Sequence, residues 1–94
     1  MFVLALEAEL QVVDSQSLKA KRHVVKALVE GARQRFAVSA AEVDHQDLWQ
    51  RTTLGFAVVA SSQQQATDII DSVDRFIWSH PEVSVLTTDR RWLE

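Results

Sequence analysis

Apolar and polar residues alternate along the first part of the chain, with apolar positions at Leu4, Leu6, Ala8, Leu10 and Val12. A period of two residues predicts a β-strand that buries one of its faces. The polar segment Asp14–Ser17 follows this strand. Its Asp and Ser residues are typical of a turn and of a helix N-cap, so we expect a helix to begin immediately after it.

From Leu18 onward the spacing of apolar residues becomes that of an amphipathic helix. The residues that share one side of this helix are Leu18, Val25, Leu28, Val29, Ala32 and Phe36. Gly31 lies within the helix, where it costs about 1 kcal/mol relative to Ala.

The second half of the chain again changes from the period of two residues that is typical of strands to the spacing of an amphipathic helix. Residues 37–43 and 52–61 are predicted to be strands, and residues 63–79 a second amphipathic helix. Pro81 cannot continue this helix because it lacks a backbone N–H. A last strand is expected from Val83 toward Trp92.

The predicted order is βαββαβ, within a single domain that spans residues 1–94. Each helix has one apolar stripe, so both are expected on one face of a four-stranded antiparallel sheet. The right-handed crossover rule favours the ferredoxin-like α+β arrangement, with strand order 4-1-3-2. This topology brings residues 14–22, 44–51 and 80–82 together at one end of the sheet, which we call the rim.

Composition excludes several classes of protein. The chain has no Cys, which excludes disulfides, thiolate metal sites and cysteine nucleophiles. No apolar run approaches the roughly 20 residues that span a bilayer. The first ten residues include Glu7 and Glu9 and lack the basic start of a signal peptide, so we expect a cytoplasmic protein with no membrane contact.

The net charge of −3 conceals a basic segment, because residues 15–35 hold six Lys or Arg and one acid. Four of these cations lie near the start of the first helix: Lys19, Lys21, Arg22 and Lys26. Cations near a helix N-terminus cost stability unless an anion compensates them. One interpretation is a contact with a phosphate, from RNA or from a small ligand. The alternative is a solvated helix face with acidic neighbours in the adjacent loops.

The most varied chemistry lies between the second and third strands. The candidate residues of this segment are Glu42, Asp44, His45, Gln46, Asp47, Trp49 and Arg51. They suit a ligand or RNA contact, or a metal or acid–base site. The structural alternative is that Asp44 and Asp47 bond backbone N–H groups of the turn, while Glu42 pairs with a lysine across the rim. Trp49 either stacks on a base or packs against a core edge or a subunit interface.

Strand alternation places Val3 and Ala5 on the sheet face away from the helices, with Ala57 and Val59 beside them. This small apolar face suits dimerisation, and we expect a homodimer. Residues 54–58 match part of the RNA-recognition signature, although its second aromatic residue is absent. No nucleophile elbow or phosphate-binding glycine loop is present, so we assign no catalytic residue, no cofactor and no metal.

Four segments resemble the YlxP-like family, a bacterial family of unknown function: residues 17–22, 24–26, 41–51 and 79–83. The resemblance extends over nearly the whole chain, and residues 41–51 are its most specific part. It implies a ferredoxin-like fold and a gene that lies among translation-initiation and ribosome-maturation factors. Such a gene neighbourhood is an association and carries no mechanism.

These observations together predict a non-enzymatic accessory protein that contacts RNA or ribosomal components through the basic and aromatic residues of the rim. Two alternatives stay open. One is a binder of a small anion or phosphorylated ligand, or an enzyme, that uses the same rim. The other is an adaptor that binds a protein through the open face of the sheet.

Overall fold

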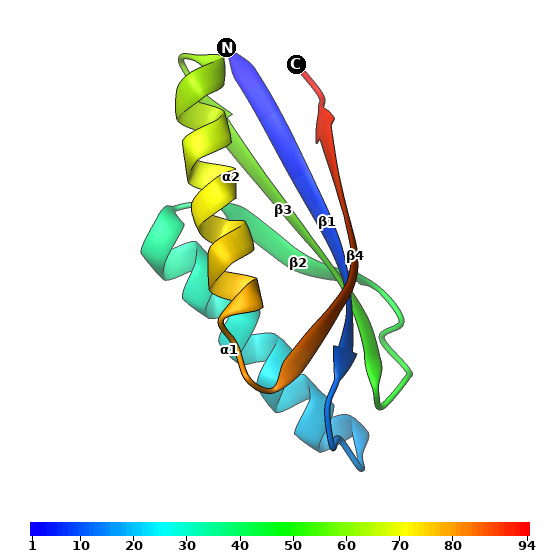
Figure 1. Cartoon of the computed structure of the whole chain (residues 1–94). Coiled ribbons are helices and arrows are strands. Elements are labelled where there is room, and N and C mark those ends of the chain that lie inside the picture. The colour runs from blue at the N-terminus through cyan, green and yellow to red at the C-terminus, as the bar shows by residue number, and fades with distance from the viewer.

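The computed structural model describes all residues 1–94, and it has the predicted βαββαβ order (Figure 1). Its elements are β1 (Phe2–Val12), α1 (Leu18–Phe36), β2 (Ser39–Asp44), β3 (Arg51–Ala60), α2 (Gln63–Trp78) and β4 (Val83–Trp92).

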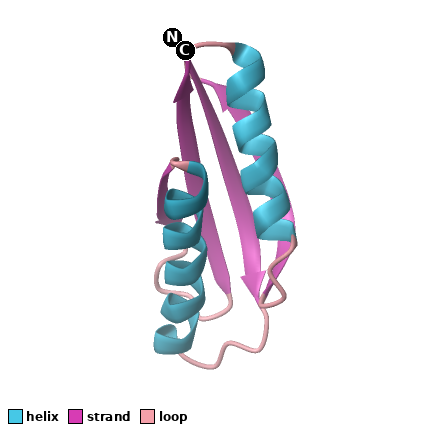
Figure 2. Ribbon diagram, turned by 90° about the vertical axis from the view of Figure 1, so that its left-hand side faces the viewer, coloured by secondary structure: helices cyan, strands magenta, loops and turns pink.

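The four strands form one sheet in the order β2-β3-β1-β4, and each neighbouring pair is antiparallel. Read from the other edge, this is the predicted order 4-1-3-2. The two helices lie side by side over one face of the sheet (Figure 2). The ferredoxin-like arrangement expected from the sequence is therefore confirmed, and the opposite face of the sheet carries no helix.

The core lies between the helices and the sheet. The alternating residues of β1 from Leu4 to Val12 are buried, and β3 buries Leu54, Phe56 and Val58 opposite them. The helices contribute their apolar stripes, which include Leu28 and Ile70. Burial of a complete Leu or Ile side chain stabilises the fold by roughly 1.5–3 kcal/mol. The apolar faces of the strands and helices, which the sequence periods of 2 and 3.6 predict, thus pack against each other in a single apolar layer.

Caps define the two ends of α1. The Ser17 hydroxyl accepts a hydrogen bond from the N–H of Ala20 at 3.0 Å, as expected for an N-cap. At the other end, Ala37 adopts a left-handed conformation with φ of 55°, and its N–H donates to the carbonyl of Arg33 at 3.1 Å. Ala37 therefore closes the helix, which is why β2 begins at Ser39 and not at residue 37 as predicted.

Gly31 allows the two helices to approach closely. A Cβ atom added to Gly31 would lie 2.8 Å from Cζ of Phe76 on α2, closer than real contacts allow. Phe76 is itself held by an edge-to-face contact with Phe36, at a ring-centroid distance of 5.7 Å. Gly31 therefore lowers the helix propensity of α1 but allows α1 to pack closely against Phe76 of α2.

We expect Gly31→Ala to leave the free energy of unfolding unchanged or lower, although Ala in a helix is normally favoured by about 1 kcal/mol. The cause is the collision with Phe76. In a Phe76→Leu background the collision is relieved, so the same change at Gly31 should be stabilising. Urea denaturation of the four proteins measures this coupling. An equal gain in both backgrounds would contradict the packing account.

Candidate functional site

The three segments expected at the rim do lie at one end of the sheet. The N–H of Val12 donates to the carbonyl of Gln50 at 2.9 Å, and the Gln50 side chain donates to the carbonyl of Ser15 at 3.1 Å. The N–H of Val13 donates to the carbonyl of Glu82 at 2.9 Å. The end of β1 is therefore bonded both to the β2–β3 hairpin and to the loop between α2 and β4.

Lys21 lies at the centre of this end and is fully buried, with 0% of its surface exposed. Its Nζ atom donates to the carbonyl oxygens of His45 at 2.7 Å and Gln46 at 3.2 Å. It also lies 2.6 Å from Oε2 of Glu42. An ammonium group has three N–H donors, and three acceptors surround this one. The buried charge is therefore paired with a carboxylate and hydrogen-bonded to two backbone carbonyls.

Glu42 connects Lys21 to the sheet. Its Oε2 atom also accepts a hydrogen bond from the hydroxyl of Thr52 at 2.6 Å, and Thr52 is buried on β3. The Glu42 side chain is only 15% exposed, so little water screens its attraction to Lys21. We call Lys21, Glu42 and Thr52, with the carbonyls of His45 and Gln46, the lysine latch. The lysine latch joins α1, β2, β3 and the hairpin. The expected pairing of Glu42 with a lysine across the rim is confirmed.

The structure corrects one part of the predicted basic surface. The sequence predicts that Lys21 contacts an anion together with the other cations of the first helix, but its side chain points inward and is fully buried. The physical reason is the helical period, because Lys21, Val25 and Leu28 are spaced i, i+4, i+7 and share the inner side of α1. A lysine that extends an apolar stripe was the signal in the sequence, and it favours a buried ion pair over a surface contact.

The hairpin conformation also depends on local bonds. His45 adopts a left-handed conformation with φ of 62°, and its N–H donates to the Asp44 carboxylate at 2.7 Å. The carbonyl of His45 accepts from the N–H of Leu48 at 3.1 Å as well as from Lys21. The structural role expected of Asp44 is confirmed. The corresponding bond expected of Asp47 is absent, and its side chain is exposed.

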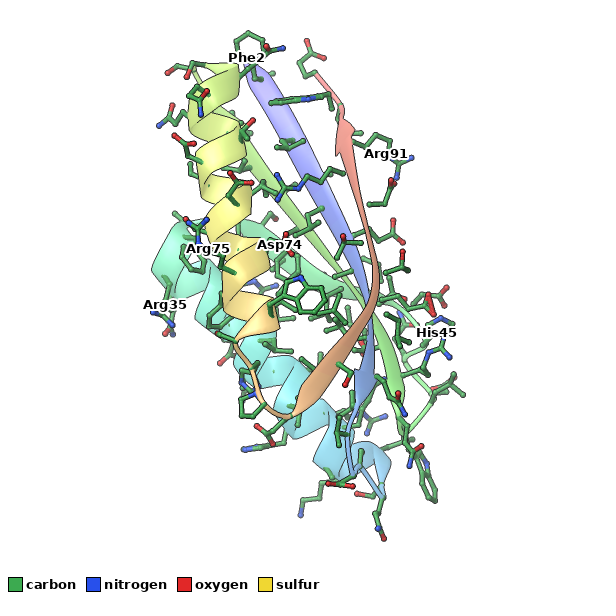
Figure 3. All side chains as sticks on the ribbon, in the orientation of Figure 1. Phe2, Arg35, His45, Asp74, Arg75 and Arg91 are labelled. Atoms are coloured by element: carbon green, nitrogen blue, oxygen red, sulfur yellow. The ribbon has the colours of Figure 1, made fainter.

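The imidazole of His45 lies on the side of the sheet that no helix covers (Figure 3). Its Nε2 atom is 3.9 Å from Oε1 of Glu9, the same oxygen that accepts a hydrogen bond from Arg51. His45 and Arg51 therefore belong to the open face of the sheet. The predicted rim is thus divided between two surfaces, the outer side of α1 and the open face. No three His, Asp or Glu side chains converge in a way that would hold a metal ion.

Three cations on the exposed side of α1 have no partner within the chain: Lys19, Arg22 and Lys26. The other arginines do have partners. Arg33 donates to the carbonyl of Ala40 at 2.6 Å, and Arg35 stacks over the rings of Phe36 and Phe76. The remaining contacts are Arg51 with Glu9, Arg75 with Ser72, Arg90 with Asp71 and Asp74, and Arg91 with Glu7.

Two large apolar residues of the hairpin, Leu48 and Trp49, remain exposed, and 54% of Trp49 is accessible to solvent. The chain's own core therefore does not bury the indole, and a partner can reach it. The indole projects from the hairpin between β2 and β3. The lysine latch fixes this hairpin by its hydrogen bonds to the carbonyls of His45 and Gln46.

The open face of the sheet has the composition predicted from strand alternation. Val3 pairs across the strands with Val59, and Ala5 with Ala57. Toward the rim, the face becomes charged where Glu7 and Glu9 replace these apolar residues. None of the helices combines the length and apolarity needed to cross a bilayer.

The fold and this rim define a small ferredoxin-like protein whose most distinctive polar residues form a structural network. Residues 3–90 match the model of a family described as "Protein of unknown function (DUF503)", and the chain belongs to that family. The chain is also similar to the uncharacterized protein YlxP of Bacillus subtilis (strain 168). The two are 40% identical over 86 residues, which cover 92% of this chain and 94% of the B. subtilis protein. The resemblance to the YlxP-like family is confirmed, and these matches carry no assigned activity.

We expect Lys21→Met to lower the free energy of unfolding by about 3 kcal/mol, because it leaves the Glu42 carboxylate half-buried without its cation. Lys26→Met is the matched control, since it makes the same change on the exposed side of α1 and should cost at most about 0.5 kcal/mol. Adding Glu42→Gln to Lys21→Met removes the stranded charge and should recover part of the loss. Chemical denaturation measures all four proteins. Equal effects of the changes at Lys21 and Lys26 would disprove the lysine latch.

Proposed function

We propose that this protein is a non-enzymatic accessory factor that contacts RNA of the translation machinery through the outer side of α1. The observation that supports this proposal is the set of three unpartnered cations, Lys19, Arg22 and Lys26. At 100° per residue they fall within an arc of about 60° on the helix surface. They therefore face the same partner.

The position of these cations within α1 strengthens their preference for an anion. The first turn of α1 contains no acidic residue, so nothing in it offsets the partial positive charge of the helix N-terminus. Lys21 lies among them in the sequence but its charge is neutralised by Glu42. The charge on the exposed side of the first half of α1 therefore comes from Lys19, Arg22 and Lys26.

RNA suits this surface better than a small anion does. The cations lie along a convex helix and are not gathered round a closed cavity, which is the usual form of a small-ligand site. The depression beside the start of α1 is lined by Lys19 and His23 but also by Asp14 and Glu82, whose charges repel an anion. A phosphate backbone, in contrast, offers charges at intervals along a line.

Trp49 supplies a second kind of contact. The hairpin lies against α1 because Lys21 bonds two of its carbonyls, and an exposed indole can stack on an unpaired base. In this proposal the cations orient the protein on the phosphates, and Trp49 adds affinity for exposed bases. The family resemblance, which implies a gene among translation factors, supports a ribosomal RNA partner over other RNA.

We expect Lys19→Ala/Arg22→Ala to weaken binding to purified ribosomal subunits, measured by co-sedimentation at two salt concentrations. Each lost phosphate contact should reduce the slope of log K against log salt by about 0.7–0.9. The control is Arg35→Ala/Arg75→Ala, which removes the same charge from cations that already have partners, and it should bind as the wild type does. Lys21 is unsuitable for this test because its replacement destabilises the fold.

Three results would count against the proposal. Absence of salt-dependent binding by the wild type would remove RNA as the partner. Equal losses in the two double variants would show that binding follows net charge and not this surface. A thermal shift with inorganic phosphate, without binding to the subunits, would favour the small-anion alternative.

A further inference from the structure

The free edge of β4 is the least protected edge of the sheet. β4 pairs only with β1, and the N–H of Leu93 donates to the carbonyl of Val3 at 2.9 Å. Because backbone groups alternate in direction along an antiparallel strand, the N–H and C=O groups of Thr88, Arg90 and Trp92 point away from β1. Unpaired groups of this kind form a template for another strand.

The opposite edge of the sheet is protected by its short length and by an irregular register. Neither feature affects β4 between Thr87 and Trp92. β2 has only six residues, and its pairing with β3 shifts register between Glu42 and Asp44. Short and bulged edges resist further pairing. β4 has ten residues, and its pairing with β1 is regular from Thr87 to Trp92.

Two large, exposed apolar side chains, Trp92 and Trp78, lie near the free edge of β4. Trp92 is 43% exposed and lies on the helix side of β4, where its ring meets that of Phe2 edge to face. Trp78 on α2 is 63% exposed.

The ion pairs of Arg90 place Trp78 along the same edge. Arg90 reaches Asp71 at 2.7 Å and Asp74 at 3.4 Å, so this side of α2 lies over β4, and Figure 3 shows Asp74 between the two elements. Trp78 follows Asp74 by one helical turn, which is about 6 Å, or roughly two residues of a strand. By this spacing Trp78 lies about level with Thr88 along the edge.

The open side of the same edge carries an uncompensated charge. Asp89 lies directly opposite Glu7 across β1 and β4, and like charges in this position are destabilising. Asp89 has no cation partner in the chain, because the nearby Arg91 approaches Glu7, at 3.9 Å. Asp89 thus forms no ion pair within the chain.

We infer that the free edge of β4 binds the β4 of a second copy of this chain, antiparallel and about a two-fold axis at Arg90. This register places Asp89 of each copy opposite Arg91 of the other, twice by symmetry. It also places Thr88 opposite Trp92, which brings Trp78 of one copy beside Trp92 of the other. The outward backbone groups of Thr88, Arg90 and Trp92 then pair, and the two sheets become one.

Charge and geometry together select a second copy over an unrelated strand. Charged residues on a strand edge normally oppose pairing. Here positions 89 and 91 carry opposite charges, so the same sequence running antiparallel to itself places each acid opposite a base. This inference concerns a surface separate from α1 and does not depend on RNA binding.

Sedimentation equilibrium of the full chain, over a range of protein concentrations, tests this inference. The wild type should be a dimer. Asp89→Arg should raise the dissociation constant at least about tenfold, because each copy then presents two like charges to the other. Asp89→Arg/Arg91→Asp exchanges the charges and should restore the dimer. Trp78→Ala should weaken association without abolishing it.

Asp89→Arg also separates a lost interface from a lost fold. It places a cation opposite Glu7, so at protein concentrations low enough to dissociate both proteins it should unfold at a denaturant concentration equal to or above that of the wild type. A monomeric wild type would overturn the inference, and so would a charge exchange that fails to restore association. Dissociation by Val59→Glu, with no effect of Asp89→Arg, would assign the dimer to the open face of the sheet and would also overturn it.

Discussion

The ion pair between Lys21 and Glu42 is the constraint on which the rim of this protein depends. It joins a helix to a strand and, through two backbone carbonyls, holds the hairpin between β2 and β3. Burial of a lysine is costly unless every donor has a partner, and here the three acceptors and the Thr52 hydroxyl complete the network. The segment with the most varied chemistry in the sequence is therefore held in place by a structural network.

The inward position of Lys21 also determines what the outer side of α1 presents. Because Lys21, Val25 and Leu28 face the core, Lys19, Arg22 and Lys26 face solvent. None of these three cations forms an ion pair within the chain. The same helical geometry thus produces a neutralised lysine inside and an unpaired basic surface outside. At the opposite side of the sheet, β4 exposes a backbone edge with a charge pattern suited to its own copy. The two surfaces are formed by different elements, so the proposed RNA contact and the proposed self-contact do not use the same residues.

Much of this architecture could be predicted from the sequence, because strands and helices leave distinct periods in the order of apolar residues. The alternation through β1 and the stripe of α1 were sufficient for the topology, and the topology was sufficient to bring the three rim segments together. The errors arose where a single side chain acts against its usual preference. Lys21 is charged yet buried, and Ala37 adopts a left-handed conformation that favours glycine. Long-range partners such as Glu9 for Arg51 could not be predicted either, because strand register does not follow from local pattern.

The state of the Lys21 ammonium group tests this account most directly, and it is observable without any variant. The chain has only three lysines, at positions 19, 21 and 26, so their ammonium nitrogens can be resolved by ¹⁵N nuclear magnetic resonance near neutral pH. Ammonium protons in water exchange too fast to be seen, whereas protons that are buried and hydrogen-bonded exchange slowly. The account predicts one slowly exchanging ammonium signal, assigned to Lys21, with rapid exchange at the other two lysines. Rapid exchange at all three lysines would mean that Lys21 is exposed to solvent and that the hairpin is not held by a buried charge.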